Sequence, residues 1–387
     1  MQKRLKVLTI CSWYPNDLKP TLGNFVQKHA EAAGLFNDNI AMAIFPSEEE
    51  KSLRITTNKN EKLTEFVAYY PKKTKGFKPF RLFQNYLQHR KAFQTLFRLV
   101  KKEYGLPDIV HLNIVYPLGI WAVWLKWRYG IPFVITENSS GFHVTSDHAY
   151  PPIVMKLCQF VVRRASVLMP VSENLKKNLK RLAPKAEFRI ISNVVDETLF
   201  RPIKAENSRK KLIHISTGVD SIKNLSGMLR VMQRIKNQNI SVDLDIVSDG
   251  DTAYAKSLCN ELKLDDVVKF HSTKTTTEIA EMLSQSDALL MFSNYENFPC
   301  VIAESMMCGK PVISSNVNGI PEHVNETNGI LVNPRDEEAL ANSIVLWYEG
   351  KVKFEAETIR AYAEQYFGYR SVGQQFDSVY RAVLKLC

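Results

Sequence analysis

The stretch ALLMFSNYENFPCVIAESMMCGKPVISS, residues 288–315, contains the pattern that indicates the fold of this chain. It begins with the apolar run Ala288–Phe292, which has the length of a buried strand. Pro299 has a fixed φ that suits the first position of a helix, and Gly309 is a natural C-terminal cap for that helix. Pro311 begins a second apolar run. The stretch therefore predicts a strand–helix–strand unit with two parallel strands.

The same alternation of apolar runs and helical periodicity extends along almost the whole chain. We expect strands at Leu5–Cys11, Ile40–Phe45, Ile109–Leu112, Phe133–Thr136, Val167–Pro170 and Phe188–Ile191, and a second series at Lys211–Ser216, Val242–Val247, Val267–Phe270, Ala288–Phe292 and Pro311–Ser314. Amphipathic helices are expected between them, for example at Phe25–Gly34, Leu87–Glu103 and Leu225–Lys236. Strands that are apolar along their whole length belong to parallel sheets covered by helices on both faces. The predicted fold class is therefore α/β and doubly wound.

The polar stretch RPIKAENSRKK, Arg201–Lys211, separates the two series of strands. A chain of 387 residues is also too long for one ordinary core. We predict an N-terminal Rossmann-like domain at residues 1–200 and a C-terminal Rossmann-like domain at residues 207–367. Because open parallel sheets bind ligands at the carboxyl ends of their strands, the expected site is a central cleft between the two sheets.

The charge of the chain is concentrated in its first half. Residues 1–200 hold 30 Lys and Arg against 16 Asp and Glu, whereas the other residues hold 21 against 24. The segment KKTKGFKPFR, Lys72–Arg81, interleaves cations with Phe77 and Phe80. It is either a solvated basic face or a contact with an anionic membrane surface. The lysines of the membrane alternative are Lys72, Lys73, Lys75 and Lys78. Nucleic acid is not an expected partner, because no recognised nucleic-acid motif accompanies the charge.

Composition and segment lengths indicate a cytoplasmic protein. The six cysteines lie apart without CxxC spacing, as expected for free thiols in a reducing compartment. The most membrane-like stretch, Ile114–Leu125, is about a dozen residues long, and a bilayer span needs ~20. The apolar run near the start breaks after a few residues, which favours a first strand over a signal peptide. The basic segment makes peripheral contact with the inner face of the cytoplasmic membrane an additional expectation.

Two glutamates in the opening stretch are candidates for ligand binding. Glu304 falls in the second turn of the predicted helix, among apolar neighbours. Carboxylates are rarely buried without a partner, and the two hydroxyls of a ribose would supply one. Glu296 lies in the loop before the helix, where free backbone N–H groups suit an anion or a sugar. The alternative is two surface glutamates on a core helix.

A second motif, STGVDSIKNLSGML, follows the first strand of the second series at Ser216–Leu229. Gly218 permits a tight turn, and Asn224 precedes a helix. Lys223 would point into the cleft, where a lysine can neutralise a departing diphosphate. Taken alone, a lysine at the start of a helix is more often a solvated surface residue.

Two motifs of the first domain also lie where strands end. Gly23 and Asn24, in YPNDLKPTLGNFVQKHA, form a turn with free backbone donors before a helix. In ITENSSGFHV, the residues Glu137, Asn138 and His143 follow the strand Phe133–Thr136. An ordinary loop histidine remains the alternative to a ligand-binding role for His143.

In this order, the motifs resemble those of one family: retaining, nucleotide-sugar-dependent glycosyltransferases of the GT-B fold, in glycosyltransferase family 4 (glycosyl transferases group 1). The most specific match is SNYENFPCVIAESMMCGKPVISSNVNGIPEHV, Ser293–Val324. LTICSWYPNDLKPTLGNFVQKHA, SIKNLSGML, DIVSDGD and NGILVNPRDEEAL support it, so the resemblance covers essentially the whole chain. In this fold the final helix, here at about residues 368–387, returns to the first domain.

The resemblance implies a function and a role for each candidate residue. The chain would transfer a glycosyl unit, as a hexosyltransferase of EC 2.4, from a nucleoside-diphosphate sugar to a hydroxyl of a carbohydrate or lipid-linked acceptor. The context would be bacterial surface polysaccharide or glycolipid synthesis, without a metal or cofactor. The catalytic residues would be Glu296, Lys223 and Asn138. Donor binding would involve Glu304, Asn297, Phe298, Pro299, Gly218 and Asn224. The acceptor side of the cleft would include Gly23, Asn24, Glu137 and His143.

Three positions depart from the family pattern, and one of them, Val194 in SNVVD where glycine is usual, affects the hinge more than the chemistry. The segment TGVDSIK lacks the arginine that usually precedes the lysine at position 223, and Arg230 is a candidate substitute. Asn138 stands where many members have a histidine, and an amide can hydrogen-bond to a sugar but does not titrate. The missing arginine and histidine favour one alternative function, a catalytically silent GT-B partner that binds a sugar or nucleotide. A second alternative is a GT-B nucleotide-sugar epimerase, which needs ionisable groups near the sugar, so Asn138 argues against it.

Overall fold

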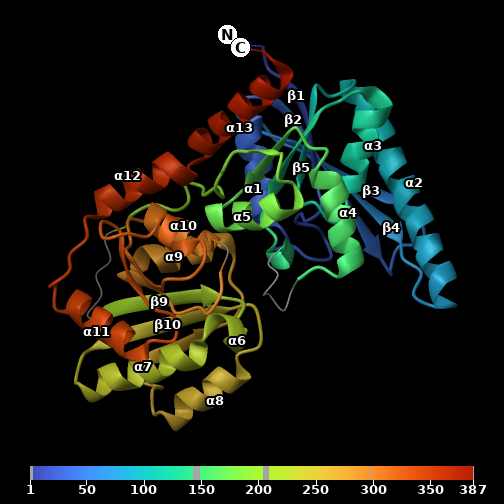
Figure 1. Ribbon diagram of the computed structural model, residues 1–387. Coiled ribbons are helices and arrows are strands. Elements are labelled where there is room, and N and C mark those ends of the chain that lie inside the picture. The colour runs from blue at the N-terminus through green and yellow to red at the C-terminus, as the bar shows by residue number, and fades with distance from the viewer. Residues whose placement is uncertain (1–2, 143–148, 204–208, 297, 387) are drawn as a thin grey trace. The chain divides into compact units, whose positions relative to one another are not determined.

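The fold is described from a computed structural model, which describes residues 3–142, 149–203, 209–296 and 298–386 (Figure 1). The chain divides into two compact units. Unit 1 comprises Met1–Val194 and Tyr369–Cys387, and unit 2 comprises Val195–Gly368. The boundary thus lies a few residues before the predicted end of the first domain at residue 200. The last segment of the chain belongs to unit 1, and it begins at Tyr369.

Unit 1 is built on one eight-stranded sheet with the order β3-β4-β2-β1-β5-β6-β7-β8. Its strands are β1 (Lys6–Cys11), β2 (Asp38–Ser47), β3 (Arg54–Lys59), β4 (Thr64–Pro71), β5 (Ile109–Asn113), β6 (Phe133–Glu137), β7 (Val167–Pro170) and β8 (Glu187–Phe188). All neighbours are parallel except β3 and β4. The sequence did not predict β3 or β4. The polar edge strand β3 carries no buried run, and its antiparallel pairing corrects the expectation of a purely parallel sheet.

Helices cover both faces of the unit 1 sheet, as predicted. They are α1 (Asn24–Gly34), α2 (Lys78–Tyr104), α3 (Gly119–Tyr129), α4 (Pro152–Val162), α5 (Glu173–Leu182) and α13 (Tyr369–Leu384), with a 3-10 turn at Ser140–Phe142. Side chains of β1 alternate between two cores. Leu8 and Ile10 join the core formed with α2 to α5, and Val7 joins the core formed with α1 and α13. This alternation explains why the strand is apolar at nearly every position.

The final helix α13 is an integral part of unit 1. It packs on α1 at Gly373, where an added Cβ atom would lie 2.2 Å from the carbonyl oxygen of Ala32. The hydroxyl of Tyr380 is 2.7 Å from Nδ1 of buried His111 on β5. These contacts within unit 1 agree with the prediction that the last helix returns to the first domain.

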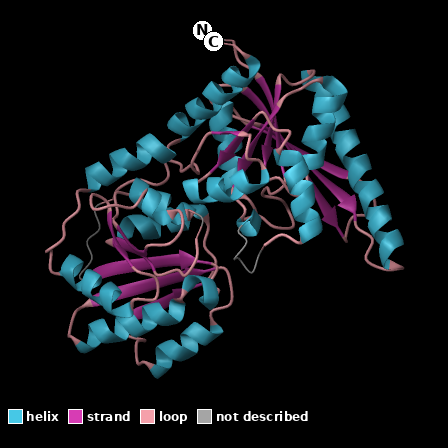
Figure 2. Cartoon of the chain, viewed as in Figure 1, coloured by secondary structure: helices cyan, strands magenta, loops and turns pink. Residues whose placement is uncertain are grey.

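Unit 2 is built on a six-stranded, fully parallel sheet with the order β11-β10-β9-β12-β13-β14 (Figure 2). The strands are β9 (Lys210–Ser216), β10 (Val242–Ser248), β11 (Val268–His271), β12 (Ala288–Met291), β13 (Val312–Ser315) and β14 (Gly329–Val332). The helices are α6 (Asp220–Lys223), α7 (Leu225–Asn237), α8 (Ala253–Glu261), α9 (Thr276–Gln285), α10 (Cys300–Met307), α11 (Glu337–Tyr348) and α12 (Ala356–Phe367), with a 3-10 turn at Ile320–Glu322. One core lies between the sheet and α7, α8 and α11, and another between the sheet and α9, α10 and α12.

Each sheet has a point at which the order of its strands reverses. In unit 2 the central strand β9 has β10 on one side and β12 on the other. In unit 1 β1 has β2 on one side and β5 on the other. Loops leaving the carboxyl ends of such neighbouring strands turn to opposite faces of the sheet and leave a crevice for a ligand. Of the predicted site residues, Gly218 lies in the loop after β9, Glu296 in the loop after β12 and Gly23 in the loop after β1.

Candidate functional site

The most prominent polar feature of unit 2 is an ion pair between Lys223 and Glu296. Lys223 ends the short helix α6 after β9, and Glu296 lies in the loop after the neighbouring strand β12. Their Nζ and Oε1 atoms are 2.5 Å apart, and the side chains are only 14% and 8% exposed. The hydroxyl of Ser293 donates a second hydrogen bond of 2.8 Å to the same carboxylate oxygen. A cation and an anion from two separate motifs therefore meet at the crevice of unit 2.

The two loops that carry this pair are also fastened to each other directly. The backbone N–H of Asn294 donates to the carbonyl of Ile222 at 2.7 Å, and its side-chain amide donates to that of Ser221 at 3.0 Å. The hydroxyl of Ser315, at the end of β13, donates to the carbonyl of Ser293 at 2.5 Å. The positions of Lys223 and Glu296 are thus fixed by the protein itself, which preorganises the site.

Gly218 and Asn224 shape the loop after β9. Gly218 has a φ of +72°, and an added Cβ atom would lie 2.6 Å from the hydroxyl oxygen of Ser248 at the end of β10. Only glycine accommodates both this φ and this close approach. Asn224 has a φ of 54°, and its side-chain oxygen accepts a hydrogen bond from the N–H of Gly227, so it caps α7. Both residues predicted for donor binding therefore define the backbone around Lys223.

A buried histidine of β9, His214, is connected to the same loop through Ser216. His214 on β9 contacts the carbonyl of Leu290 through Nδ1 at 2.9 Å and the hydroxyl of Ser216 through Nε2 at 2.7 Å. Burial lowers the pKa of His214 to about 4, so the imidazole stays neutral at pH 7. Ser216 in turn accepts a hydrogen bond from the N–H of Gly218. His214 was not predicted, because no feature of its apolar strand sequence distinguishes it from a core residue.

Helix α10 begins at Cys300, directly after Pro299, where the sequence predicted it. Glu304 lies in its second turn and is half-buried, while the neighbouring Ala303 is fully buried. The side chain of Phe298 packs in the core, with its ring centroid 4.7 Å from that of His323. If Phe298 contacts the donor as predicted, it therefore does so through its backbone. The donor-binding residue Asn297 lies outside the described residues.

Arg230 does not take the place of the arginine that the motif lacks. Its guanidinium contacts Glu337 on α11, with Nε and an Nη atom at 2.8 and 2.7 Å from Oε1. This ion pair links α7 to α11 on the surface of unit 2. Lys223 is the cation that contacts Glu296, and Nε of Arg335 donates to the side-chain oxygen of Asn294 in the same loop at 3.1 Å.

In unit 1, the buried carboxylate of Glu137 holds two loops together. It accepts hydrogen bonds from the backbone N–H groups of Val115 at 2.9 Å, Asn138 at 2.9 Å and Ser139 at 2.7 Å. Burial raises the pKa of Glu137 to about 7, although the three N–H donors oppose that shift. Because its side chain is only 1% exposed, Glu137 positions the loops after β5 and β6 and has little surface to offer an acceptor.

We expect Glu137 to make the stability of the protein depend on pH. Its pKa is raised from 4.5 to about 7 in the folded state, so folding favours the protonated form. The resulting stabilisation is complete below pH 4.5 and is lost as the pH rises to about 7, on the order of 3 kcal/mol in total. Glu137→Gln does not titrate, so urea unfolding of both proteins across this range should give a difference in unfolding free energy that changes with pH. A constant difference would contradict the shifted pKa.

The other predicted residues of unit 1 lie at the ends of β1 and β6. Gly23 has a φ of +69°, and an added Cβ atom would lie 2.7 Å from the backbone carbon of Trp13. This glycine lets the loop after β1 lie against the start of α1, where Asn24 is half-exposed. The side-chain amide of Asn138 donates to Oδ1 of Asn193 at 2.6 Å. His143 lies outside the described residues.

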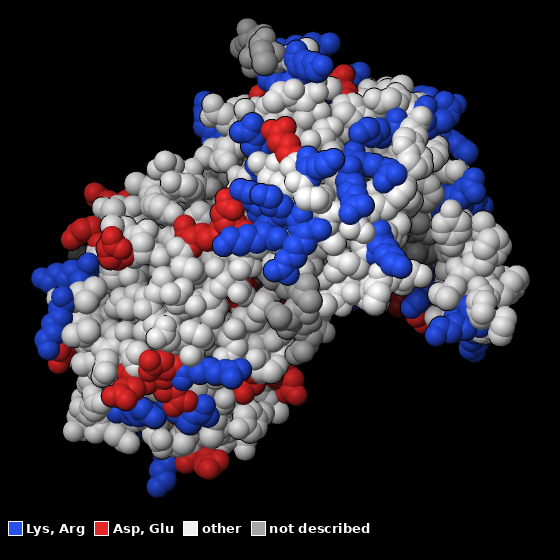
Figure 3. Space-filling model, in the orientation of Figure 1, with Lys and Arg blue, Asp and Glu red and all other residues white. Residues whose placement is uncertain are grey.

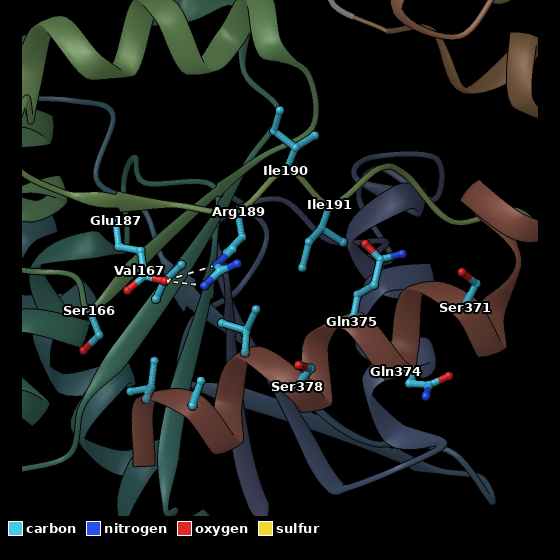
Figure 4. Close-up of a pocket in the computed structure, with 13 residues that line it drawn as sticks. Ser166, Val167, Glu187, Arg189, Ile190, Ile191, Ser371, Gln374, Gln375 and Ser378 are labelled. Atoms are coloured by element: carbon cyan, nitrogen blue, oxygen red, sulfur yellow. Dashed lines mark hydrogen bonds and ion pairs between the residues drawn. The ribbon is translucent and has the colours of Figure 1, made fainter. Parts of the chain in front are cut away.

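A cavity of about 670 Å³ lies elsewhere in unit 1, between the β8 edge of the sheet and α13 (Figure 4). Glu187 and Arg189 form an exposed ion pair of 3.1 Å at its rim. The polar side chains of Gln375 and Ser378 face it from α13 (Figure 4). This groove follows the edge of the sheet and not the carboxyl ends of β1, β5 and β6, so we assign no ligand to it.

Other expectations from composition can be compared with the described residues. Cys11, Cys158, Cys259 and Cys308 are free thiols and buried, as predicted, whereas Cys300 is half-exposed. In the described part of the chain, no helix has both the length and the apolar character that a membrane span requires.

The architecture of the chain matches solved structures of the GT-B class. Alr3699/HepE of Anabaena, crystallised in complex with UDP and glucose, superposes with a TM-score of 0.72 over 97% of this chain and 99% of that chain, at 17% identity. At this identity the likeness shows the fold, which consists of two Rossmann-like α/β domains.

Family models identify the group within this class. The model "Glycosyltransferase Family 4" matches residues 56–199, and the model "Glycosyl transferases group 1" matches residues 196–365. The chain belongs to the family 4 glycosyltransferases, because the two matches together extend from residue 56 to residue 365.

Two curated relatives illustrate the range of this similarity. N-acetyl-alpha-D-glucosaminyl L-malate synthase of Bacillus anthracis is 27% identical over 72% of this chain and 75% of its own length. The putative teichuronic acid biosynthesis glycosyltransferase TuaC of Bacillus subtilis (strain 168) is 22% identical over 97% of this chain and 95% of its own length. The second comparison covers both units.

Proposed function

We propose that this glycosyltransferase moves a hexosyl unit from a nucleoside-diphosphate sugar to a hydroxyl, with retention at the anomeric carbon. The observation that carries the proposal is the Lys223–Glu296 pair, held at the carboxyl ends of the neighbouring strands β9 and β12. A cation at this point suits the diphosphate of a donor, and a carboxylate suits the hydroxyls of its sugar. The solved complex of Alr3699/HepE with UDP and glucose supports a donor of this kind.

Lys223 can bind the diphosphate while it keeps its ion pair with Glu296. An ammonium group has three N–H donors, and in this structure one of them points to Glu296. The other two are available for phosphate oxygens. Negative charge develops on the diphosphate as the bond to the sugar breaks, and Lys223 would stabilise that charge. This role needs no metal ion, so metal-independent transfer is part of the proposal.

The reacting sugar would be held by Glu296 and the nucleoside by Glu304. Departure of the diphosphate leaves an oxocarbenium-like sugar, and the acceptor hydroxyl attacks from the face that the diphosphate leaves. Glu296 would position the sugar hydroxyls and stabilise positive charge nearby. Glu304, half-exposed on α10, would accept hydrogen bonds from the ribose hydroxyls. Asn138 of unit 1 would complete the catalytic group by hydrogen bonding to the sugar.

The biological context that we propose is bacterial surface polysaccharide or glycolipid synthesis. The name of the relative TuaC, a putative teichuronic acid biosynthesis glycosyltransferase, supports it. The acceptor would be a carbohydrate or a lipid-linked carbohydrate bound by unit 1, near Gly23 and Asn24. The enzyme would work in the cytoplasm and at the inner face of the cytoplasmic membrane, with Lys72, Lys73, Lys75 and Lys78 toward anionic lipid.

A panel of donors tests the proposal. Thermal unfolding with UDP, GDP and ADP sugars should show stabilisation by one class of donor, because a ligand that binds the folded state raises the unfolding temperature. Incubation with that donor and extracted lipid-linked acceptors should release the free nucleoside diphosphate, and EDTA should leave the rate unchanged. Stabilisation without release or transfer would instead support a silent binding partner. Conversion of the donor to an epimer would support an epimerase.

A further inference from the structure

Helix α2 begins much earlier than the sequence predicted. It starts at Lys78, more than two turns before the expected start at Leu87. The buried residues of α2 are Ala92, Phe93, Leu96, Phe97 and Val100. None of the described side chains from Lys78 to Lys91 is buried. In this segment, the leading half of α2, His89 packs against Tyr70 and Trp121, whereas the exposed side chains before it gain little from packing on the sheet.

The leading half of α2 and the residue before it expose an unusual amount of apolar surface. The exposed fractions are 77% for Phe77, 59% for Phe80, 56% for Leu82 and Phe83, 52% for Tyr86 and 43% for Leu87. Single exposed apolar side chains are ordinary on protein surfaces. A contiguous group of this size marks a surface that meets an apolar partner.

The apolar side chains include a set that shares one face of the helix. Phe80, Phe83 and Leu87 are three and four residues apart, so they lie side by side along α2. Further along the same line lie Lys91, four residues after Leu87, and Arg98, seven residues after Lys91. The outer face of α2 is therefore apolar in its leading half and basic in the half that covers the sheet.

Two polar side chains of the leading half, Arg81 and Asn85, bond to the loop that precedes the helix. The guanidinium of Arg81 donates to the carbonyl of Thr74 at 2.5 Å. The side chain of Asn85 bonds to both the N–H and the carbonyl of Lys73, at 2.8 and 3.0 Å. In an ordinary surface helix the apolar side packs inward, so this arrangement is reversed.

Charge around the segment is of one sign. Residues 66–102 contain ten Lys and Arg and no Asp or Glu. Glu48 pairs with Lys72 at 2.8 Å, and among the described residues no ion pair involves Lys73, Lys75 or Lys78. In Figure 3 the surface over the leading half of α2 is mostly white with blue at its border. Apolar and cationic groups are thus combined on one surface.

We infer that the leading half of α2 inserts its aromatic and aliphatic side chains into the interfacial region of an anionic bilayer. Such a bilayer offers an apolar layer for Phe80 and Phe83 and anionic headgroups for the lysines. A second copy of this chain would bring the same cations against each other, which is unfavourable. A nucleic acid would attract the charge but leave Leu82 and Leu87 in water. The inference does not depend on the proposed glycosyl transfer.

Vesicle co-sedimentation of the full chain tests insertion. We expect binding to phosphatidylcholine vesicles that contain phosphatidylglycerol, and weaker binding to phosphatidylcholine alone. Phe80→Ser with Phe83→Ser should lower the partition coefficient about tenfold or more, because two large side chains no longer leave water. Lys73→Gln, Lys75→Gln and Lys78→Gln together should remove the preference for the anionic lipid.

Matched controls separate the surface from general effects. Tyr254→Ser, at a site 64% exposed on α8, removes an aromatic side chain elsewhere, and Lys180→Gln, Lys185→Gln and Lys269→Gln remove the same charge from other exposed sites. Neither control should change binding by more than a small factor. If the Phe80→Ser, Phe83→Ser variant bound vesicles as strongly as the wild type, charge alone would account for membrane binding, and insertion would be overturned. Failure of the wild type to bind any vesicle, or binding of single-stranded DNA in preference to vesicles, would also overturn it.

Discussion

Lys223→Ala should lower the kcat of glycosyl transfer by about two to three orders of magnitude, as expected when one preorganised donor to a developing negative charge is removed. Lys223 forms an ion pair with Glu296 in unit 2, and its ammonium lies 2.5 Å from that carboxylate. The KM for the donor should change less, because the charge on the diphosphate grows only as the bond to the sugar breaks. Steady-state kinetics at saturating acceptor measures both quantities.

The control for this variant is Lys236→Ala. Lys236 also forms a 2.5 Å ion pair, with Asp266, in the same unit, but it lies in the last turn of α7, whereas Lys223 precedes the first turn. We expect that variant to retain the wild-type kcat. In the Lys223→Ala variant the carboxylate of Glu296 loses its cation and keeps the hydrogen bond from Ser293, which can lower the stability of the fold. Thermal unfolding of the variant must therefore be measured together with its kinetics. A Lys223→Ala protein that is folded and fully active would remove Lys223 from the mechanism.

Glu304→Ala should weaken binding of the nucleoside diphosphate by about ten- to a hundredfold, since hydrogen bonds to a charged group contribute roughly 1.5–3 kcal/mol. The loss should be equal for the diphosphate alone and for the donor sugar, because the ribose is common to both. Isothermal titration with each ligand measures the two affinities. Because Glu304 is only half-buried, we expect the variant to retain its fold, and a thermal unfolding curve checks this.

Glu338→Ala provides the matched control, as an exposed glutamate on helix α11 of the same unit. It should leave the affinity for both ligands as in the wild type. If Glu304→Ala changed only the KM for the acceptor, the assignment of Glu304 to the donor would be wrong. If Glu304→Ala weakened binding of the donor sugar but left the affinity for the nucleoside diphosphate unchanged, Glu304 would instead contact the transferred sugar.

Features of the fold that depend on local sequence were predicted well. Buried parallel strands such as β1 and β12 are apolar along their length, and Pro299 and Gly309 bracket α10. Edge strand β3 was missed, because a strand exposed on one side needs no apolar run. The start of α2 was missed for a related reason: its apolar residues face outward, and the periodicity of burial begins only at Ala92.

The sequence by itself determined two series of buried strands, the loops that follow them and the residue types that those loops carry. Lys223 and Glu296 could be named in this way, although 73 residues separate them. Only the tertiary structure decided that they form an ion pair, because β9 and β12 become neighbours through the order of strands in the sheet. The tertiary structure also decided that the carboxylate of Glu137 is buried and that Arg230 on α7 pairs with Glu337 on α11. Burial and pairing depend on residues that are distant in the chain.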